Sequence, residues 1–144
     1  MGIFDVLRIS ASGLKAQRTR MEVVASNIAN VNTTRTEEGG PFRKKEVVFT
    51  TQDVSEGTPF GSLFQQKVEE GVNVEEVKES TRPFEQTHDP YHPDADANGY
   101  VTYPNVNVME EMADMVAATR AYEANVNVIN NTKEMFNRSL EIGK

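Results

Sequence analysis

The feature that most constrains this sequence is a repeat of apolar residues near its carboxyl end, from Asn107 to about Ile142. Its positions fall alternately four and three residues apart, and no Gly or Pro interrupts them. Such a repeat keeps one stripe of a helix facing a partner helix, as in a coiled-coil seam. The apolar members of this predicted assembly seam are Val108, Met112, Met115, Tyr122, Val126, Ile129, Phe136 and Leu140. At about 1.5 Å per residue this helix would be roughly 50 Å long, so it needs a second long helix.

Residues 3–31 are predicted to form that second helix. Its own seam has members seven residues apart, namely Leu7, Leu14, Met21 and Ile28. Gly13 lies among small residues inside the helix, where glycine costs up to about 1 kcal/mol relative to alanine. Close approach of another backbone would explain this glycine, and simple tolerance is the alternative. The Asn and Thr residues that follow, up to Thr34, favour a helix end because they compete for backbone hydrogen bonds.

The carboxy-terminal helix carries more apolar surface than one partner helix covers. A second row beside the seam consists of Ala121, Val128, Met135 and Ile142. Because a single partner covers only a narrow stripe, this row is predicted to be an inter-subunit contact. Two polar members of the seam, Thr119 and Lys133, either set the register between helices or are tolerated near solvent. Asn107 is expected to cap the helix, with Glu110 reaching back to it.

The middle of the chain has a different character. It holds all six prolines and six of the nine glycines. Short β-like runs occur between turn residues at Glu46–Thr51, Gly71–Val77 and Gly99–Tyr103, and Thr50–Gln66 is expected to be mobile. The sequence therefore predicts an α+β fold. In it, long amino- and carboxy-terminal helices pair as a coiled-coil-like rod, with a small loop-rich β module between them. The predicted segments are 1–35, 36–105 and 106–144.

Charge and composition exclude several functions. The formal net charge is −7, and residues 36–105 carry six basic and fourteen acidic groups, which argues against a nucleic-acid partner. Without cysteine, the chain has no disulfide, thiolate zinc site or cysteine nucleophile. No apolar run is long enough for membrane insertion, and the first residues lack the leader of a cleaved secretion signal. Because no phosphate-binding glycine loop or serine elbow is present, we expect no enzyme activity and no cofactor.

A proline-rich turn before residue 100 is the candidate metal site. Asp94, Asp96 and Asn98 match the first half of a calcium-binding loop, but the glutamate that should close the loop is missing. His88 and His92 could chelate a metal only if the proline between them kept both on one side. The alternative, which we favour, is a turn whose polar side chains bond their own backbone. The sequence therefore predicts no metal site.

Three motifs resemble those of bacterial flagellar rod and hook proteins. The amino-terminal one runs from Ser12 to Gln17 and continues from Ala25 to Thr33. Arg120–Asn125 is similar to the family's carboxy-terminal helix pattern, and His92–Asn107 resembles the proximal-rod, FlgC type of that family. Together the motifs cover about half of the chain. The residues that match the amino-terminal motif are Ser12, Gly13, Leu14, Asn27, Asn30 and Asn32.

The resemblance implies a structural subunit of the flagellar proximal rod, which polymerises helically through its terminal helices and transmits torque across the periplasm. It also implies export through the flagellum's own type III apparatus, without a cleaved signal peptide. The implied partners are copies of the chain, other rod proteins, the export-gate adaptor and the surrounding basal-body ring. Two alternatives remain open at this point: a calcium- or metal-responsive binding module, and another secreted coiled-coil component of a type III apparatus.

Overall fold

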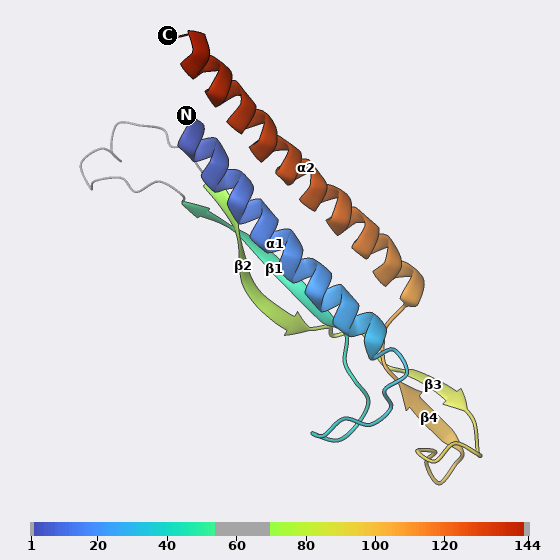
Figure 1. The fold of residues 1–144 in the computed structure, drawn as a ribbon. Coiled ribbons are helices and arrows are strands. Elements are labelled where there is room, and N and C mark those ends of the chain that lie inside the picture. The colour runs from blue at the N-terminus through green and yellow to red at the C-terminus, as the bar shows by residue number, and fades with distance from the viewer. Residues whose placement is uncertain (1, 54–69, 143–144) are drawn as a thin grey trace.

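The computed structural model describes residues 2–53 and 70–142. Figure 1 shows an elongated molecule in which two long helices lie side by side. The elements, in chain order, are α1 (Ile3–Ala29), β1 (Lys45–Asp53), β2 (Glu70–Glu79), β3 (Glu85–His88), β4 (Tyr100–Tyr103) and α2 (Val108–Ile142). The predicted α+β class is therefore confirmed, with a long helix at each end. Of the segment expected to be mobile, residues 50–53 belong to β1 and the rest lies outside the described residues.

The two helices run antiparallel. The Met21 sulfur lies 3.6 Å from the Thr119 hydroxyl, and a Cβ built on Gly13 would lie 3.0 Å from the Asn125 side chain. As residue numbers rise along α1, the numbers of their partners fall along α2. Gly13 thus has the close neighbour that the sequence suggested, although that neighbour is a side chain and not a backbone. That the seam has coiled-coil geometry stays a prediction.

Strands β1 and β2 form an antiparallel hairpin that lies along α1. Their register pairs Lys45 with Glu79, and it shifts at a bulge between Val48 and Phe49. The hairpin covers the side of α1 away from α2 (Figure 1). The Val72 amide of β2 donates a hydrogen bond to the Ser12 hydroxyl, at 3.1 Å. α1 is therefore the middle layer, between α2 and the hairpin.

Strands β3 and β4 form a second, separate two-stranded sheet. It lies at the end of the molecule where α1 ends and α2 begins (Figure 1). The β-like runs expected from the sequence fall largely within β1, β2 and β4, whereas β3 was not expected. All four β3 residues, Glu85–His88, are exposed, so the strand has no apolar alternation from which it could have been predicted.

The buried interior is small and unusually polar. The buried residues include the apolar Ala16, Val24, Val101, Val106 and Ala118, and the polar Ser10, Asn27, Lys44, Ser80, Asn105 and Glu111. A polar group is stable in such a place only when it has hydrogen-bond partners. The bonds of these residues therefore decide how the chain holds together. No described helix is both long enough and apolar enough to cross a membrane.

Candidate assembly interface

The helices and the hairpin meet at Asn27, close to the end of α1. Its side-chain oxygen accepts a hydrogen bond from the Lys45 amide at 2.9 Å, and its side-chain nitrogen donates to the Lys45 carbonyl at 2.9 Å. The same nitrogen donates to Glu111 on α2, again at 2.9 Å. One asparagine thus joins α1 to the first residue of β1 and to the first turn of α2. Its amide can do so because it offers both a donor and an acceptor.

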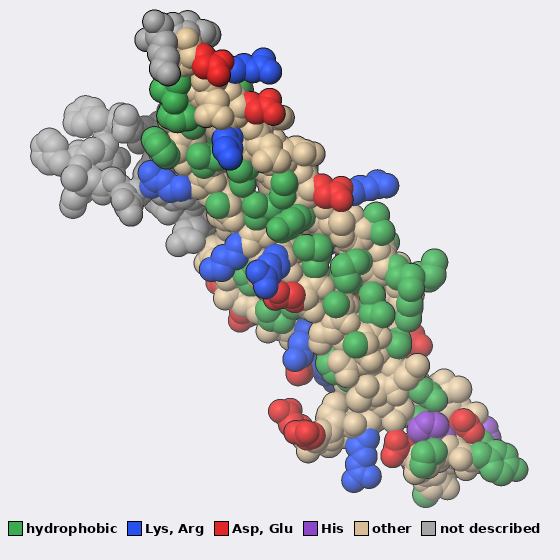
Figure 2. All heavy atoms as spheres, viewed as in Figure 1, with side chains coloured by type: hydrophobic (Ala, Val, Ile, Leu, Met, Phe, Trp, Pro, Cys, Tyr) green, Lys and Arg blue, Asp and Glu red, His purple; other side chains and the backbone are tan. Residues whose placement is uncertain are grey.

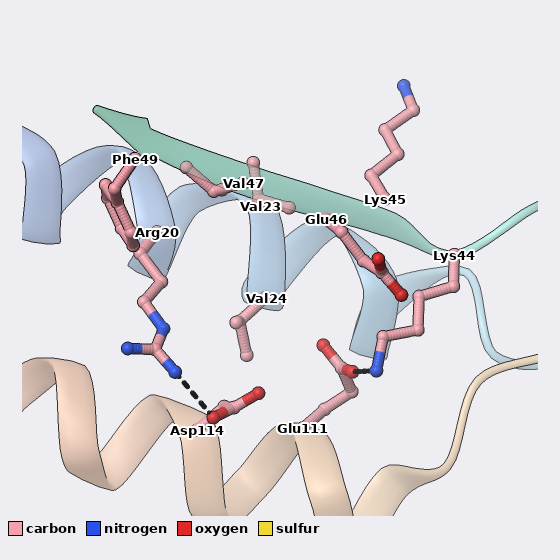
Figure 3. Close-up of a pocket in the computed structure, with 10 residues that line it drawn as sticks. All are labelled: Arg20, Val23, Val24, Lys44, Lys45, Glu46, Val47, Phe49, Glu111 and Asp114. Carbon is pink, nitrogen blue, oxygen red and sulfur yellow. Dashed lines mark hydrogen bonds and ion pairs between the residues drawn. The ribbon is translucent and has the colours of Figure 1, made fainter. Parts of the chain in front are cut away.

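A buried ion pair completes this junction. The Lys44 ammonium lies 2.6 Å from the Glu111 carboxylate, and the two side chains are only 9% and 1% exposed (Figure 3). The Lys44 amide donates to the side-chain oxygen of Asn105 at 2.9 Å, and the Asn105 nitrogen donates to the Arg82 carbonyl at 2.9 Å. Removing one partner of such a buried pair is strongly destabilising, because the other charge is left without compensation. We call Asn27, Lys44 and Glu111 the polar node.

A surface groove of about 410 Å³ opens beside the polar node, between α1, β1 and α2. Figure 3 shows that Arg20 reaches across it to Asp114 on α2, and that Val24 points into it from α1. The Arg20–Asp114 ion pair is 2.7 Å long and partly exposed. Both acidic residues that α2 contributes to the groove, Glu111 and Asp114, are therefore ion-paired. The two ion pairs therefore hold α2 against α1 and against the start of β1.

The start of α2 is capped as expected, but without the reciprocal bond. The Asn107 side-chain oxygen accepts hydrogen bonds from the amides of Met109 and Glu110, at 3.0 and 3.3 Å. The Glu110 carboxylate instead pairs with Arg82, 2.9 Å away. A carboxylate in the first turn of a helix is also stabilised by the helix dipole. Glu110 thus ties α2 to the segment before β3.

The α2 surface that packs on α1 differs in part from the predicted assembly seam. Of the predicted members, Val108, Met115, Tyr122, Val126 and Ile129 are half-buried, while Met112, Phe136 and Leu140 are exposed. The buried members of α2 are Glu111 and Ala118, and Asn125 and Thr132 continue their row at seven-residue spacing as half-buried residues. Sequence reasoning missed this row because a search for apolar periodicity passes over small and polar residues.

The predicted seam of α1 and the inter-subunit row of α2 are placed as follows. Leu7, Leu14, Met21 and Ile28 are all half-buried, and Met21 faces α2. In the second row, Ala121 is half-buried, whereas Val128 and Met135 are 41% and 70% exposed. Ile142 is the last residue of α2, and its side chain lies outside the described residues.

Further apolar side chains of α2 are exposed near its start. Met109, Met112 and Val116 are 74%, 50% and 52% exposed. Figure 2 shows hydrophobic side chains distributed over the helical face of the molecule. Isolated exposed apolar residues are common, but a run of them along one helix marks a contact surface.

The turn proposed as an alternative to a calcium loop is held by its own side chains. The Asp96 carboxylate accepts hydrogen bonds from the amides of Asn98 and Tyr100, at 2.8 and 2.9 Å, and Asp94 accepts one from Thr34 at 2.7 Å. His88 packs edge-on against Tyr100. Among the described residues, no group of three or more His, Cys, Asp or Glu side chains could hold a metal ion.

Comparison with known proteins identifies the family. Residues 7–35 match the family described as "Flagella basal body rod protein", and residues 97–142 match "Flagellar basal body rod FlgEFG protein C-terminal". A Bacillus subtilis protein named "Flagellar basal-body rod protein FlgC" is 44% identical over the full length of both chains. The chain belongs to the FlgC family of flagellar basal-body rod proteins. Its relatives identify it as a structural subunit of the rod, located in the flagellar basal body.

Other relatives agree over the whole chain. A Borreliella burgdorferi protein of the same name is 41% identical over 99% of this chain and 98% of its own length. A Salmonella typhimurium protein of that name is 39% identical over 100% of both. The similarity therefore extends through the middle segment, where the sequence motifs carried little of the resemblance.

Members of the amino-terminal motif of this rod protein contact α2 and both strands of the β1–β2 hairpin. Ser12 bonds β2, Gly13 faces α2, and Asn27 belongs to the polar node. Asn30 accepts a hydrogen bond from the Thr33 hydroxyl at 3.2 Å, so it closes the turn after α1. Of the remaining members, Leu14 is half-buried and Asn32 is exposed.

Proposed function

We propose that this rod protein polymerises helically through α1 and α2 and so transmits torque across the periplasm. The observation that carries the proposal is the apolar surface of α2, which α1 leaves uncovered. Val128 and Met135 are exposed on one side of α2, and Met109, Met112 and Val116 are exposed near its start. Burying such surface between subunits contributes roughly 25 cal/mol per Å² of apolar area. Contacts that join different faces of neighbouring copies do not close on themselves, and they build a filament.

The partners in this proposal are copies of the chain and other rod proteins, with the export-gate adaptor below and the basal-body ring around them. Residues 1–35 and 106–144 would act as the axial units, and residues 36–105 as the module between them. We propose export through the type III apparatus with no cleavage.

The proposal assigns no catalytic role to the chain. The two α2 carboxylates that line the groove are engaged in ion pairs with Arg20 and Lys44. One ion pair joins α1 to α2, and the other joins α2 to the residue before β1. A role as a building unit accounts for every contact described at the junction.

The test is to place charges in the proposed inter-subunit row. We expect Val128→Asp with Met135→Asp to leave the isolated chain folded, because both residues are exposed, but to prevent incorporation into the rod. Burying each unpaired carboxylate between subunits would cost several kcal/mol. The measurement is motility, together with the subunit content of purified basal bodies, in cells that lack the chromosomal copy.

The matched control is Asn127→Asp with Asn130→Asp. These residues are exposed on the same helix and lie one position before and two positions after Val128, on a different side of the helix from the row. The control variant should support motility. If the row variant also builds rods of normal length, α2 does not contact its neighbours through this row.

A further inference from the structure

The contact between α1 and α2 has a register that apolar packing alone does not define. Two rows of α2 face α1, and each repeats at seven-residue spacing. One row contains Glu111, Ala118, Asn125 and Thr132, and the other contains Met115, Tyr122 and Ile129. Sliding α2 by seven residues, about 10 Å, would present a similar surface to α1. Something other than the repeat must therefore select the observed register.

The observed register leaves the end of α2 without a partner in its own chain. Asn27 contacts Glu111, and Gly13 lies against Asn125. In both pairs the α1 number and the α2 number add up to 138, and this sum describes the antiparallel register. The first residue of α1, Ile3, therefore lies level with Met135, and α2 projects beyond it (Figure 1). Every described residue from Lys133 to Glu141 is exposed. We call residues 136–142 the overhang.

A shift by one repeat would cover this overhang. Phe136 and Leu140 are 40% and 57% exposed at present. In a register where facing numbers add up to 145, Phe136 would lie level with Ile9, and Leu140 with Asp5. The same shift would carry Val108 and Met115, which are half-buried in the observed register, past the end of α1 at Ala29, so apolar burial alone does not select one register.

The polar node opposes this shift. In the shifted register Ala118 would occupy the place of Glu111, opposite Asn27 and Lys44. The Lys44 ammonium, whose side chain is 9% exposed, would then lose its buried counter-ion, and the Asn27 amide would lose an acceptor. A buried unpaired charge is far more costly than a few exposed apolar side chains. A single polar position within a repeating seam is a known way to fix register.

We propose that the polar node of Asn27, Lys44 and Glu111 sets the register of α2 on α1, and thereby keeps the overhang projecting to bind a second copy of this chain. The second copy offers Ile3 and Phe4 at the start of its α1, which are 40% and 70% exposed. The stripe on the overhang continues the rows that α1 packs against, so a helix of the same kind fits it. This inference rests on the proposed assembly through the helices.

The experiment moves the node along α2. In the variant Glu111→Ala with Ala118→Glu the same groups are present, but the carboxylate lies seven residues later in the same row. The chain has no cysteine, so introduced cysteines are the only sites for spin labels. Lys15→Cys is combined with Glu123→Cys or with Asn130→Cys, all at exposed positions. In the observed register Lys15 is level with Glu123, and in the shifted register it is level with Asn130.

The expected result is an exchange of distances. In the full-length chain with the native node, the label pair at 15 and 123 should be the shorter one. In the transplanted variant the pair at 15 and 130 should take over that shorter distance, a displacement of about 10 Å along the axis. A register that stays unchanged would overturn the proposal, and so would broad distances for the chain with the native node.

Two further variants separate the node from other causes. Lys44→Met with Glu111→Met keeps the side-chain volume but removes the charges. This variant should populate the shifted register. If it folds and keeps the observed register, the polar node does not set the register. Arg20→Ala with Asp114→Ala removes a partly exposed ion pair between the same helices and should leave the register unchanged.

Assembly in cells distinguishes this inference from the proposed function. The transplanted variant should fail to build rods although it is folded. If its register shifts and rods still form, the node sets the register but the overhang is not needed. If the variant Val128→Asp with Met135→Asp also builds rods, the proposed assembly through α2 itself is wrong.

Discussion

At the scale of single residues, the Asn27 side chain takes the place of a neighbouring strand beside Lys45. Its amide satisfies both the N–H and the C=O of that residue and also bonds Glu111. We predict that Asn27→Ala lowers the free energy of unfolding by about 3 kcal/mol, because it removes three hydrogen bonds that contribute about 1 kcal/mol each. Urea denaturation of the two chains measures the difference.

Asn32→Ala is the matched control for this substitution. Asn32 belongs to the same motif but is exposed, so its removal should change the free energy of unfolding by no more than about 0.5 kcal/mol. Equal effects of the two substitutions would show that Asn27 does not hold the junction.

Gly99 occupies a backbone conformation that other residues avoid. Its φ is +78°, and an added Cβ would lie 3.1 Å from Pro90 and 3.2 Å from the His88 ring. We predict that Gly99→Ala destabilises the β3–β4 end by about 2 kcal/mol or more, since the strained backbone and the contacts both oppose it. Thermal unfolding, followed by the near-ultraviolet signal of the neighbouring tyrosines, reports the change.

Gly39→Ala separates the two causes. Gly39 has a φ of +91°, but nothing lies within 4 Å of an added Cβ. This substitution should cost only the backbone strain, about 1 kcal/mol. If both glycines respond equally, the contacts of Gly99 with Pro90 and His88 contribute nothing.

At the scale of elements, both helices could be predicted from the sequence, and the packing between them only in part. Periodicity locates α1 and α2 because their apolar residues recur along one face. It does not reveal that Glu111 and Ala118 are the buried members of α2, because their burial depends on Lys44 and Asn27, which are distant in sequence. Tertiary contacts of this kind cannot be inferred from local spacing.

The strands, like the helices, could be predicted from the sequence only in part. β1, β2 and β4 contain valine, threonine or aromatic residues next to turns, which is the local signature of a strand. β3 has no apolar residue and forms because β4 pairs with it, Glu85 against Tyr103 and His88 against Tyr100. The turn between them was predicted correctly because the Asp89 and Asp96 side chains accept hydrogen bonds from nearby amides, and this effect is local.

The helix contact at Gly13 gives a prediction with a definite sign. In an exposed helix Gly→Ala gains about 1 kcal/mol, but here the added Cβ would lie 3.0 Å from the Asn125 nitrogen. We predict that Gly13→Ala alone gives no gain, whereas in an Asn125→Ala background it stabilises the chain by about 1 kcal/mol. A double-mutant cycle of unfolding free energies measures this coupling. Additive effects would mean that Gly13 and Asn125 are not in contact.

At the scale of the whole molecule, packing is uneven along the long axis. The polar node, Asn105 and the β3–β4 sheet lie at one end, and the starts of β1 and α2 are bonded there. Towards the other end, no described residue of α2 after Ala118 is buried. The single chain is thus firmly joined at one end, whereas the exposed apolar residues Ile3, Phe4, Met135, Phe136 and Leu140 lie at the other.

This gradient predicts how the chain exchanges its amide hydrogens. In dilute full-length protein, amides of residues 136–141 should exchange at least about tenfold faster than those of residues 112–118, since local opening is easiest where few contacts must break. In purified basal bodies the difference should disappear, because a neighbouring copy would cover the overhang. Hydrogen exchange with mass spectrometry, run on both samples, measures this. Uniform protection along α2 in the dilute protein would contradict the gradient, and persistent fast exchange of residues 136–141 in the rod would show that the overhang binds no neighbour.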